Sequence, residues 1–90
     1  MKKVIFNADD FCYSLEFNKG ILELLEEGTV TSTTVMVNHY NDEQAGQIAV
    51  LREIPNISVG LHVEFINNKD FKGDIENQYA KFEGLLGRAP

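Results

Sequence analysis

The alternation of apolar and polar residues along the chain predicts three strands. Three short runs are apolar or rich in β-branched side chains, which favours a strand over a helix. The first run is almost continuously apolar, as is typical of a strand that is covered on both faces. The three predicted strands cover residues 3–7, 29–38 and 57–63.

A segment with the apolar spacing of a helix follows each predicted strand. Ser14 can cap a helix over residues 15–27, and Gly28 is placed to end that helix. Asn41, followed three positions later by Gln44, resembles a capping box that begins a short second helix.

The third predicted helix follows a polar loop over residues 67–73. Asp74 is its expected N-cap, and Gly87 is placed to end it. The order of elements is therefore βαβαβα, and a helix between successive strands predicts a parallel sheet. Three strands cannot close a barrel, so we expect a further part of the chain or a second copy to complete the sheet. The side chains expected on the buried face of the third helix are Ile75, Tyr79, Phe82, Leu85 and Leu86.

The composition indicates a single α/β unit over residues 1–90 and narrows its partners. Hydrophobic residues make up 43% of the chain and charged residues 24%, which is typical of one globular domain. The formal net charge of −6 disfavours nucleic acid and anionic membranes as partners. The first apolar run is too short for a signal peptide or a membrane span, and the single cysteine cannot form an internal disulfide. We therefore expect a cytoplasmic protein.

Polar side chains that suit metal binding or acid–base chemistry follow the predicted strands. Asp9 and Asp10 come after the first strand, Asn38 ends the second, and His62 lies near the end of the third. In parallel α/β proteins, ligands and catalytic groups gather at this end of the strands. Asp and His are suitable ligands for Zn²⁺, Mn²⁺ or Co²⁺, and a second carboxylate would be free to hold a water. Two protein ligands are too few for a tight site, so a third is expected from elsewhere.

Each of these side chains also has a purely structural interpretation. A pair of aspartates is common in solvated turns, and a lone histidine at a strand end often makes only a structural hydrogen bond. Asn38 can cap the loop that it begins, and His39 is most simply a loop residue. Cys12 lies beside carboxylates that disfavour its thiolate, which indicates an inert thiol and not a ligand.

Four motifs taken together resemble the N-terminal part of the YdjC-like carbohydrate deacetylases. They are N-A-D-D-F at 7–11, N-x-G-I at 18–21, V-T-S-T-T-V-M-V-N at 30–38 and V-G-L-H at 59–62. The resemblance covers essentially all of the chain and implies the first part of a TIM-barrel-like fold. It also implies metal-dependent removal of acetyl groups from N-acetylated oligosaccharides, with one divalent ion that is Mg²⁺, Zn²⁺, Mn²⁺ or Co²⁺.

The resemblance implies a role for several individual residues. Carried over by position, Asp9 is expected to be the general base, and Asp10 and His62 are expected to be metal ligands. Asn38, at the end of the second predicted strand, is an additional candidate for substrate binding. The family's remaining metal histidine and catalytic groups lie beyond the last residue of this chain, so we expect an N-terminal segment of a longer catalytic domain. The family usually has glycine at the position of Cys12, which implies a backbone angle that cysteine adopts only with strain.

Two other functions remain consistent with parts of the pattern. The first is a non-catalytic module that binds a divalent ion weakly or forms a homo-oligomer through its open sheet edges. The second is a phosphoacceptor receiver domain, which also has an acidic pair after its first strand. A receiver domain predicts an aspartate at the end of the third strand, where this chain has His62. The sequence therefore favours the deacetylase over both alternatives.

Overall fold

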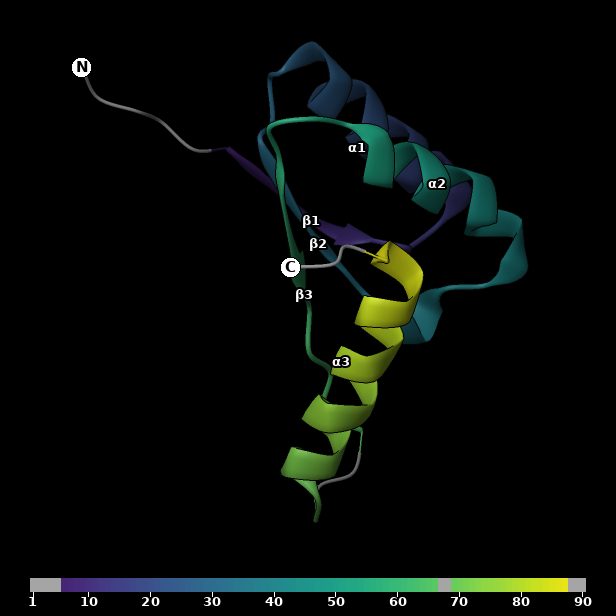
Figure 1. Cartoon of the computed structure of the whole chain (residues 1–90), viewed down its shortest axis with the longest axis vertical. Coiled ribbons are helices and arrows are strands. Elements are labelled where there is room, and N and C mark those ends of the chain that lie inside the picture. The colour runs from purple at the N-terminus through teal and green to yellow at the C-terminus, as the bar shows by residue number, and fades with distance from the viewer. Residues whose placement is uncertain (1–5, 67–68, 88–90) are drawn as a thin grey trace, which may run out of the picture.

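A three-stranded parallel sheet forms the centre of the computed structural model, which describes residues 6–66 and 69–87 (Figure 1). The strands are hydrogen-bonded in the order β1-β2-β3. This order confirms the predicted parallel sheet, and within the described residues the sheet is open and not a closed barrel. Its strands are β1 (Asn7–Phe11), β2 (Ser32–Val35) and β3 (Ser58–Leu61).

Three α-helices accompany the sheet. In Figure 1, α1 (Leu15–Glu27) and α2 (Ala45–Glu53) lie side by side, and α3 (Phe71–Leu86) contacts α2 and β3 near its C-terminal end. Two 3-10 turns, η1 (Val37–His39) and η2 (Asp42–Gln44), connect β2 to α2. Within residues 6–66 and 69–87, no helix combines the length and the apolar character needed to cross a membrane.

The boundaries of the first two helices follow the local signals in the sequence. The Ser14 hydroxyl accepts a hydrogen bond from the Phe17 amide at 3.0 Å, and Gly28 ends α1 with a φ of 78°. The capping box of Asn41 and Gln44 is also present. It begins the turn η2, which continues directly into α2, so both predicted helix starts are confirmed.

The third helix begins earlier than predicted. Asp70, and not Asp74, is the N-cap, because the Asp70 side chain accepts a hydrogen bond from the Gly73 amide at 2.9 Å. The expected loop over residues 67–73 is therefore wrong from residue 71 onward, while residues 67–68 lie outside the described part. The N-terminal part of α3 projects beyond the sheet (Figure 1). Ile75 and Tyr79, which were both expected on the buried face, are exposed.

The second and third strands are shorter than predicted, and the first is shifted along the chain. Asp9 and Asp10 belong to β1 and do not follow it. The predicted strand over residues 3–7 lies mostly outside the described residues. β2 ends at Val35 and the chain enters η1 at Val37, so Asn38 lies in η1 and does not end the strand as predicted.

One face of the sheet is apolar and covered, whereas the other is polar. Phe11, Val35 and Leu51 are fully buried in the core between the sheet and the helices, and Leu86 joins the same core. On the opposite face, hydrogen bonds join side chains of β1 and β2, and these residues are partly or fully exposed. The expectation of cover on both faces is therefore not met by the described residues. The polar side chains joined on this open face are Asn7, Asp9, Ser32 and Thr34.

Cys12 directly follows the strand β1 and has a backbone conformation that glycine adopts more readily than other residues. Its φ is 87°, which confirms the expected strained angle at this position. The residue is fully buried, and its backbone is held at both polar groups. The Asn18 side chain accepts a hydrogen bond from the Cys12 amide at 2.7 Å, and the Gln44 side chain donates one to the Cys12 carbonyl at 3.1 Å.

Replacing Cys12 by glycine or by alanine separates backbone strain from side-chain packing. Both variants lose the buried sulfur, but only Cys12→Gly also relieves the positive φ. We expect Cys12→Gly to be more stable than Cys12→Ala by about 1 kcal/mol in urea unfolding followed by circular dichroism. Equal stability of the two variants would contradict a strained backbone.

The buried thiol also predicts a loss of stability in alkali. Burial raises the pKa of Cys12 from 9.0 to about 11. Above pH 9 the unfolded chain therefore loses this proton while the folded chain keeps it, which favours unfolding until about pH 11. We expect the free energy of unfolding to fall by about 2–3 kcal/mol more across this window than in Cys12→Ala, since each pKa unit is worth about 1.4 kcal/mol. If the free energy of unfolding fell equally with pH in the unsubstituted protein and in Cys12→Ala, the result would contradict a raised pKa of Cys12.

Candidate functional site

The strand β1 contains a β-bulge at its two aspartates. Phe11 pairs with Val35, and Asp9 and Asp10 together lie opposite the single residue Thr34. In a regular strand, adjacent side chains point to opposite faces, so one of two neighbouring aspartates would point into the apolar core. The bulge adds one residue, which keeps Phe11 in the core and leaves both carboxylates out of it.

Thr34 makes hydrogen bonds to both aspartates of the bulge. Its hydroxyl donates a hydrogen bond to Asp9 Oδ1 at 3.3 Å and accepts one from the Asp10 amide, also at 3.3 Å. The Asn7 side chain donates a second hydrogen bond to the same Asp9 oxygen. The Asp9 carboxylate is thus held on the open polar face of the sheet, where solvent reaches it.

Asp10 and His62 meet although their strands are not neighbours. The Asp10 Oδ1 and His62 Nδ1 atoms are 2.9 Å apart, across the end of β2. His62 follows β3 directly and is kept in register by a hydrogen bond from its amide to the Val35 carbonyl at 3.0 Å. The side chains of Asp10 and His62 are 40% and 42% exposed, so the pair is open to solvent on one side.

The paired atoms of Asp10 and His62 are suited to hold a cation. Asp10 Oδ1 is itself shielded from solvent and makes no well-aligned hydrogen bond, despite its short distance to the imidazole. A carboxylate oxygen and an imidazole nitrogen that face each other in this way are both ligand types for divalent transition metals. Within the described residues, no cluster of three or more His, Cys, Asp or Glu side chains is present. Asp10 and His62 are therefore two candidate ligands, and a metal site at this place stays a prediction.

The structure does not bring Asn38 into contact with these residues. Asn38 lies in η1, and its Oδ1 atom accepts a hydrogen bond from Lys81 Nζ of α3 at 2.9 Å. Its Nδ2 atom is buried without a hydrogen-bond partner. With Lys81 and Leu85, Asn38 lines a cavity of about 410 Å³ between η1 and α3. A role for Asn38 in substrate binding stays a prediction.

Two side chains near these residues carry contacts that the sequence analysis did not assign. Thr34 lies in the run that was predicted as a strand from its β-branched residues and was not singled out, yet its hydroxyl makes hydrogen bonds to the Asp9 carboxylate and the Asp10 amide. Glu64 was not singled out, yet its Oε2 atom lies 3.1 Å from His39 Nε2. In the sequence, its position two residues after His62 was the one indication that Glu64 lies near the candidate site.

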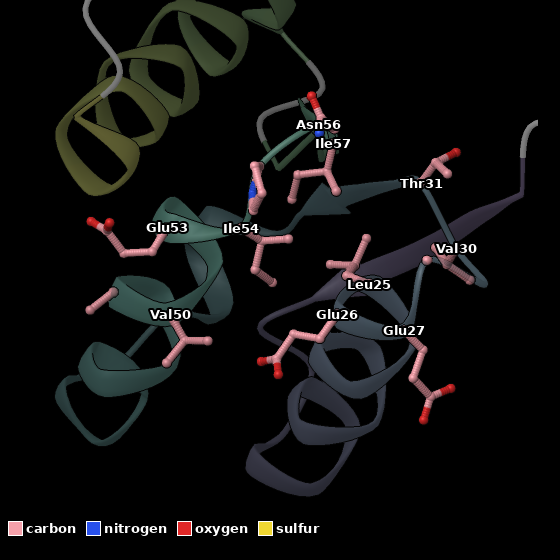
Figure 2. Close-up of a pocket in the computed structure, with 13 residues that line it drawn as sticks. Leu25, Glu26, Glu27, Val30, Thr31, Val50, Glu53, Ile54, Asn56 and Ile57 are labelled. Atoms are coloured by element: carbon pink, nitrogen blue, oxygen red, sulfur yellow. The ribbon is translucent and has the colours of Figure 1, made fainter.

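A further cavity lies at the opposite end of the sheet. It has a volume of about 840 Å³ and lies between the C-terminal ends of α1 and α2. Figure 2 shows the apolar side chains of Leu25, Ile54 and Ile57 in its wall, with the carboxylates of Glu26 and Glu53 on facing helices. The predicted site residues do not line this cavity.

Comparison with known proteins identifies relatives over nearly the whole chain. The family described as "YdjC-like protein" matches residues 3–88. A "Chitooligosaccharide deacetylase" of Salmonella paratyphi B is 46% identical over 94% of this chain and 32% of its own length. A "Carbohydrate deacetylase" of Vibrio cholerae is 39% identical over 80% of this chain and 28% of its own. One of Brevibacillus brevis is 48% identical over 68% of this chain and 24% of its own.

The chain therefore spans less than a third of the length of the curated relatives it matches. No solved structure matches the chain, so the TIM-barrel-like completion of the sheet stays a prediction. The family match covers both the bulge at Asp9 and Asp10 and the residue His62 that meets it. The chain belongs to the YdjC-like protein family.

Proposed function

We propose that this chain carries part of the active site of a metal-dependent carbohydrate deacetylase, which removes acetyl groups from N-acetylated oligosaccharides. The observation that carries this proposal is the pairing of Asp10 with His62 directly beside the exposed carboxylate of Asp9. The names of the curated relatives support a sugar as the substrate. The open polar face of the sheet supports a hydrophilic substrate, because it offers hydroxyl, amide and carboxylate groups.

In this proposal the two aspartates have different roles. Asp10 and His62 hold one divalent ion, either Mg²⁺, Zn²⁺, Mn²⁺ or Co²⁺, which supplies Lewis acidity toward a water and the acetamide carbonyl when it is bound. Asp9 is the general base and accepts the proton of the attacking water. The hydrogen bonds from Thr34 and Asn7 hold the Asp9 carboxylate on the exposed polar face of the sheet.

Completion of the site requires groups that the described residues do not supply. A third ligand and an acid for the departing amine are expected from the part of the relatives that this chain does not match, which is more than two thirds of their length. The alternative, a non-catalytic module, is favoured by the open sheet and by the incomplete ligand set. An activity assay in a protein that also contains the missing segment distinguishes the deacetylase from the non-catalytic module.

The base assignment predicts a loss of turnover without a loss of metal. The protein for this test carries residues 1–88 in place of the matching segment of the Salmonella relative, to which the chain is 46% identical. We expect Asp9→Asn to lower the rate of acetate release from a chitooligosaccharide by about 10²-fold or more, because proton transfer by a positioned side chain contributes that much. Asp42→Asn, on the exposed turn η2, is the matched control and should retain the rate. Full activity of Asp9→Asn would show that another group is the base.

If Asp10 and His62 are the metal ligands, substitution of either one should weaken metal binding far more than substitution of Asp9. We expect Asp10→Asn and His62→Gln to weaken Zn²⁺ or Mn²⁺ binding to the chain by about tenfold or more in equilibrium dialysis, since even groups that only support a ligand are worth that much. Asp9→Asn should change the affinity far less, because its carboxylate is already held by Thr34 and Asn7. If Asp9→Asn lost the metal and Asp10→Asn retained it, the two roles would be exchanged.

A further inference from the structure

The cavity between the C-terminal ends of α1 and α2 has apolar side chains in its wall that solvent can reach. Its volume is about 840 Å³, and Val50, Ile54 and Ile57 line it (Figure 2). Ile54 and Ile57 are half-buried and Val50 is 41% exposed, so each keeps surface that a ligand can contact. Apolar surface left in contact with water is unfavourable, and its burial lowers the free energy. The wall therefore suits a ligand with an apolar body.

Two small residues help to keep this cavity open. Gly28, which ends α1, has no side chain, and apart from its chain neighbours no atom lies within 4 Å of the place that a Cβ atom would take. Ala49 of α2 contributes only a methyl group to the wall. Sites for small molecules have volumes of about 300–1,000 Å³, whereas a stable contact with another protein needs a far wider surface. The size of the cavity therefore favours a small ligand.

The charged residues of this cavity are all acidic. Glu26, Glu27 and Glu53 line it and are exposed, and its described lining residues include no lysine, arginine or histidine. In Figure 2 the Glu26 side chain extends from α1 toward α2. Within the described part of the chain, none of these three carboxylates forms an ion pair. Their combined negative charge favours a ligand that carries a positive group.

We propose that this cavity binds a small primary amine with an apolar body, such as an alkylamine. Its ammonium group pairs with the Glu26 carboxylate, and its alkyl chain covers Ile54 and Ile57. A sugar does not suit this wall, because its hydroxyl groups would lose hydrogen bonds to water against apolar side chains. A fatty acid does not suit it either, since its carboxylate would be repelled by three others. The site is separate from the proposed deacetylase site, whose residues do not line the cavity.

The test is a titration of the full chain with n-butylamine, n-hexylamine and n-octylamine, followed by NMR of the backbone amides. It is carried out at pH 7, where an alkylamine is protonated, and in 0.15 M salt. We expect the resonances of Leu25, Ile54 and Ile57 to shift and those of Asp10 and His62 to stay. Each added methylene group should tighten binding by about fourfold, which is the value of burying one such group.

Hexan-1-ol is the matched ligand without a charge. It has the same alkyl chain as n-hexylamine, so it contacts the same apolar wall but does not pair with a carboxylate. We expect it to bind about twofold to fivefold more weakly, because an exposed ion pair contributes about that much.

Three variants separate the role of the charge from that of the space. Glu26→Gln should weaken n-hexylamine binding by about twofold to fivefold and leave hexan-1-ol binding unchanged. Glu16→Gln is the matched control, because it removes the same charge from the same helix about 15 Å away and outside this cavity. It should bind both ligands as the unsubstituted chain does. Ala49→Leu fills the cavity without a change of charge and should abolish the binding of both ligands. Circular dichroism verifies that the variants fold.

Four results would overturn the proposal. They are the absence of shifts at the cavity, undiminished binding to Ale49→Leu, equal affinity for n-hexylamine and hexan-1-ol, and equal weakening by Glu26→Gln and Glu16→Gln, which indicates only a general attraction to an acidic chain. Cavity resonances that shift with protein concentration alone would assign the cavity to a second copy, and this too overturns the amine site. If Ala49→Leu fails to fold, the comparison of the two hexyl ligands on the unsubstituted chain decides. The deacetylase proposal is unaffected by each of these results, because the two sites share no residue.

Discussion

The hydrogen bonds to the backbone of Cys12 are the constraint on which the rest of this structure depends. The chain leaves β1 inside an apolar core, where an unpaired amide or carbonyl group is costly. Asn18 of α1 satisfies the amide and Gln44 of η2 satisfies the carbonyl, and both side chains are almost completely buried. These two contacts bind the first strand to the first helix and to the start of the second, and they fix the positive φ of Cys12.

The β-bulge directly before Cys12 places the two candidate carboxylates at this end of β1. A strand that must keep Phe11 in the core has room for only one outward residue between two inward ones. The bulge at Asp9 and Asp10 accommodates two, and Thr34 of the next strand supports both. One carboxylate then lies on the polar face, and the other reaches His62 across the end of β2.

The two faces of the sheet have different roles. One packs the apolar core, and the other carries the candidate site residues. The helix-covered face holds Phe11, Val35 and Leu51 in one apolar core, so packing there fixes the positions of the strand ends. The opposite face carries hydrogen-bonded polar side chains and the proposed base. The segments after β2 and β3 add a second polar pair, His39 and Glu64, at the same end of the sheet. The proposed site thus consists of polar side chains that are positioned by a rigid core.

The sequence by itself determined what depends on neighbours along the chain. The caps Ser14 and Gly28 act within one helical turn, so the bounds of α1 were predictable, as was the order of elements. Asp9, Asp10 and His62 were named as candidates from the sequence, but Asp9 and Asp10 were expected after the first strand and lie within β1. The start of α3 was not predictable, since Asp70 and Asp74 both suit an N-cap and local signals do not rank them.

Only the tertiary structure decided how distant segments meet. The bulge depends on the register between β1 and β2, the approach of Asp10 to His62 depends on the order of all three strands, and Lys81 reaches Asn38 only because α3 packs beside η1. The Glu64 amide donates a hydrogen bond to Gln78, fourteen residues away in the chain. Such pairings are set by the packing of the whole core, which no short stretch of sequence encodes.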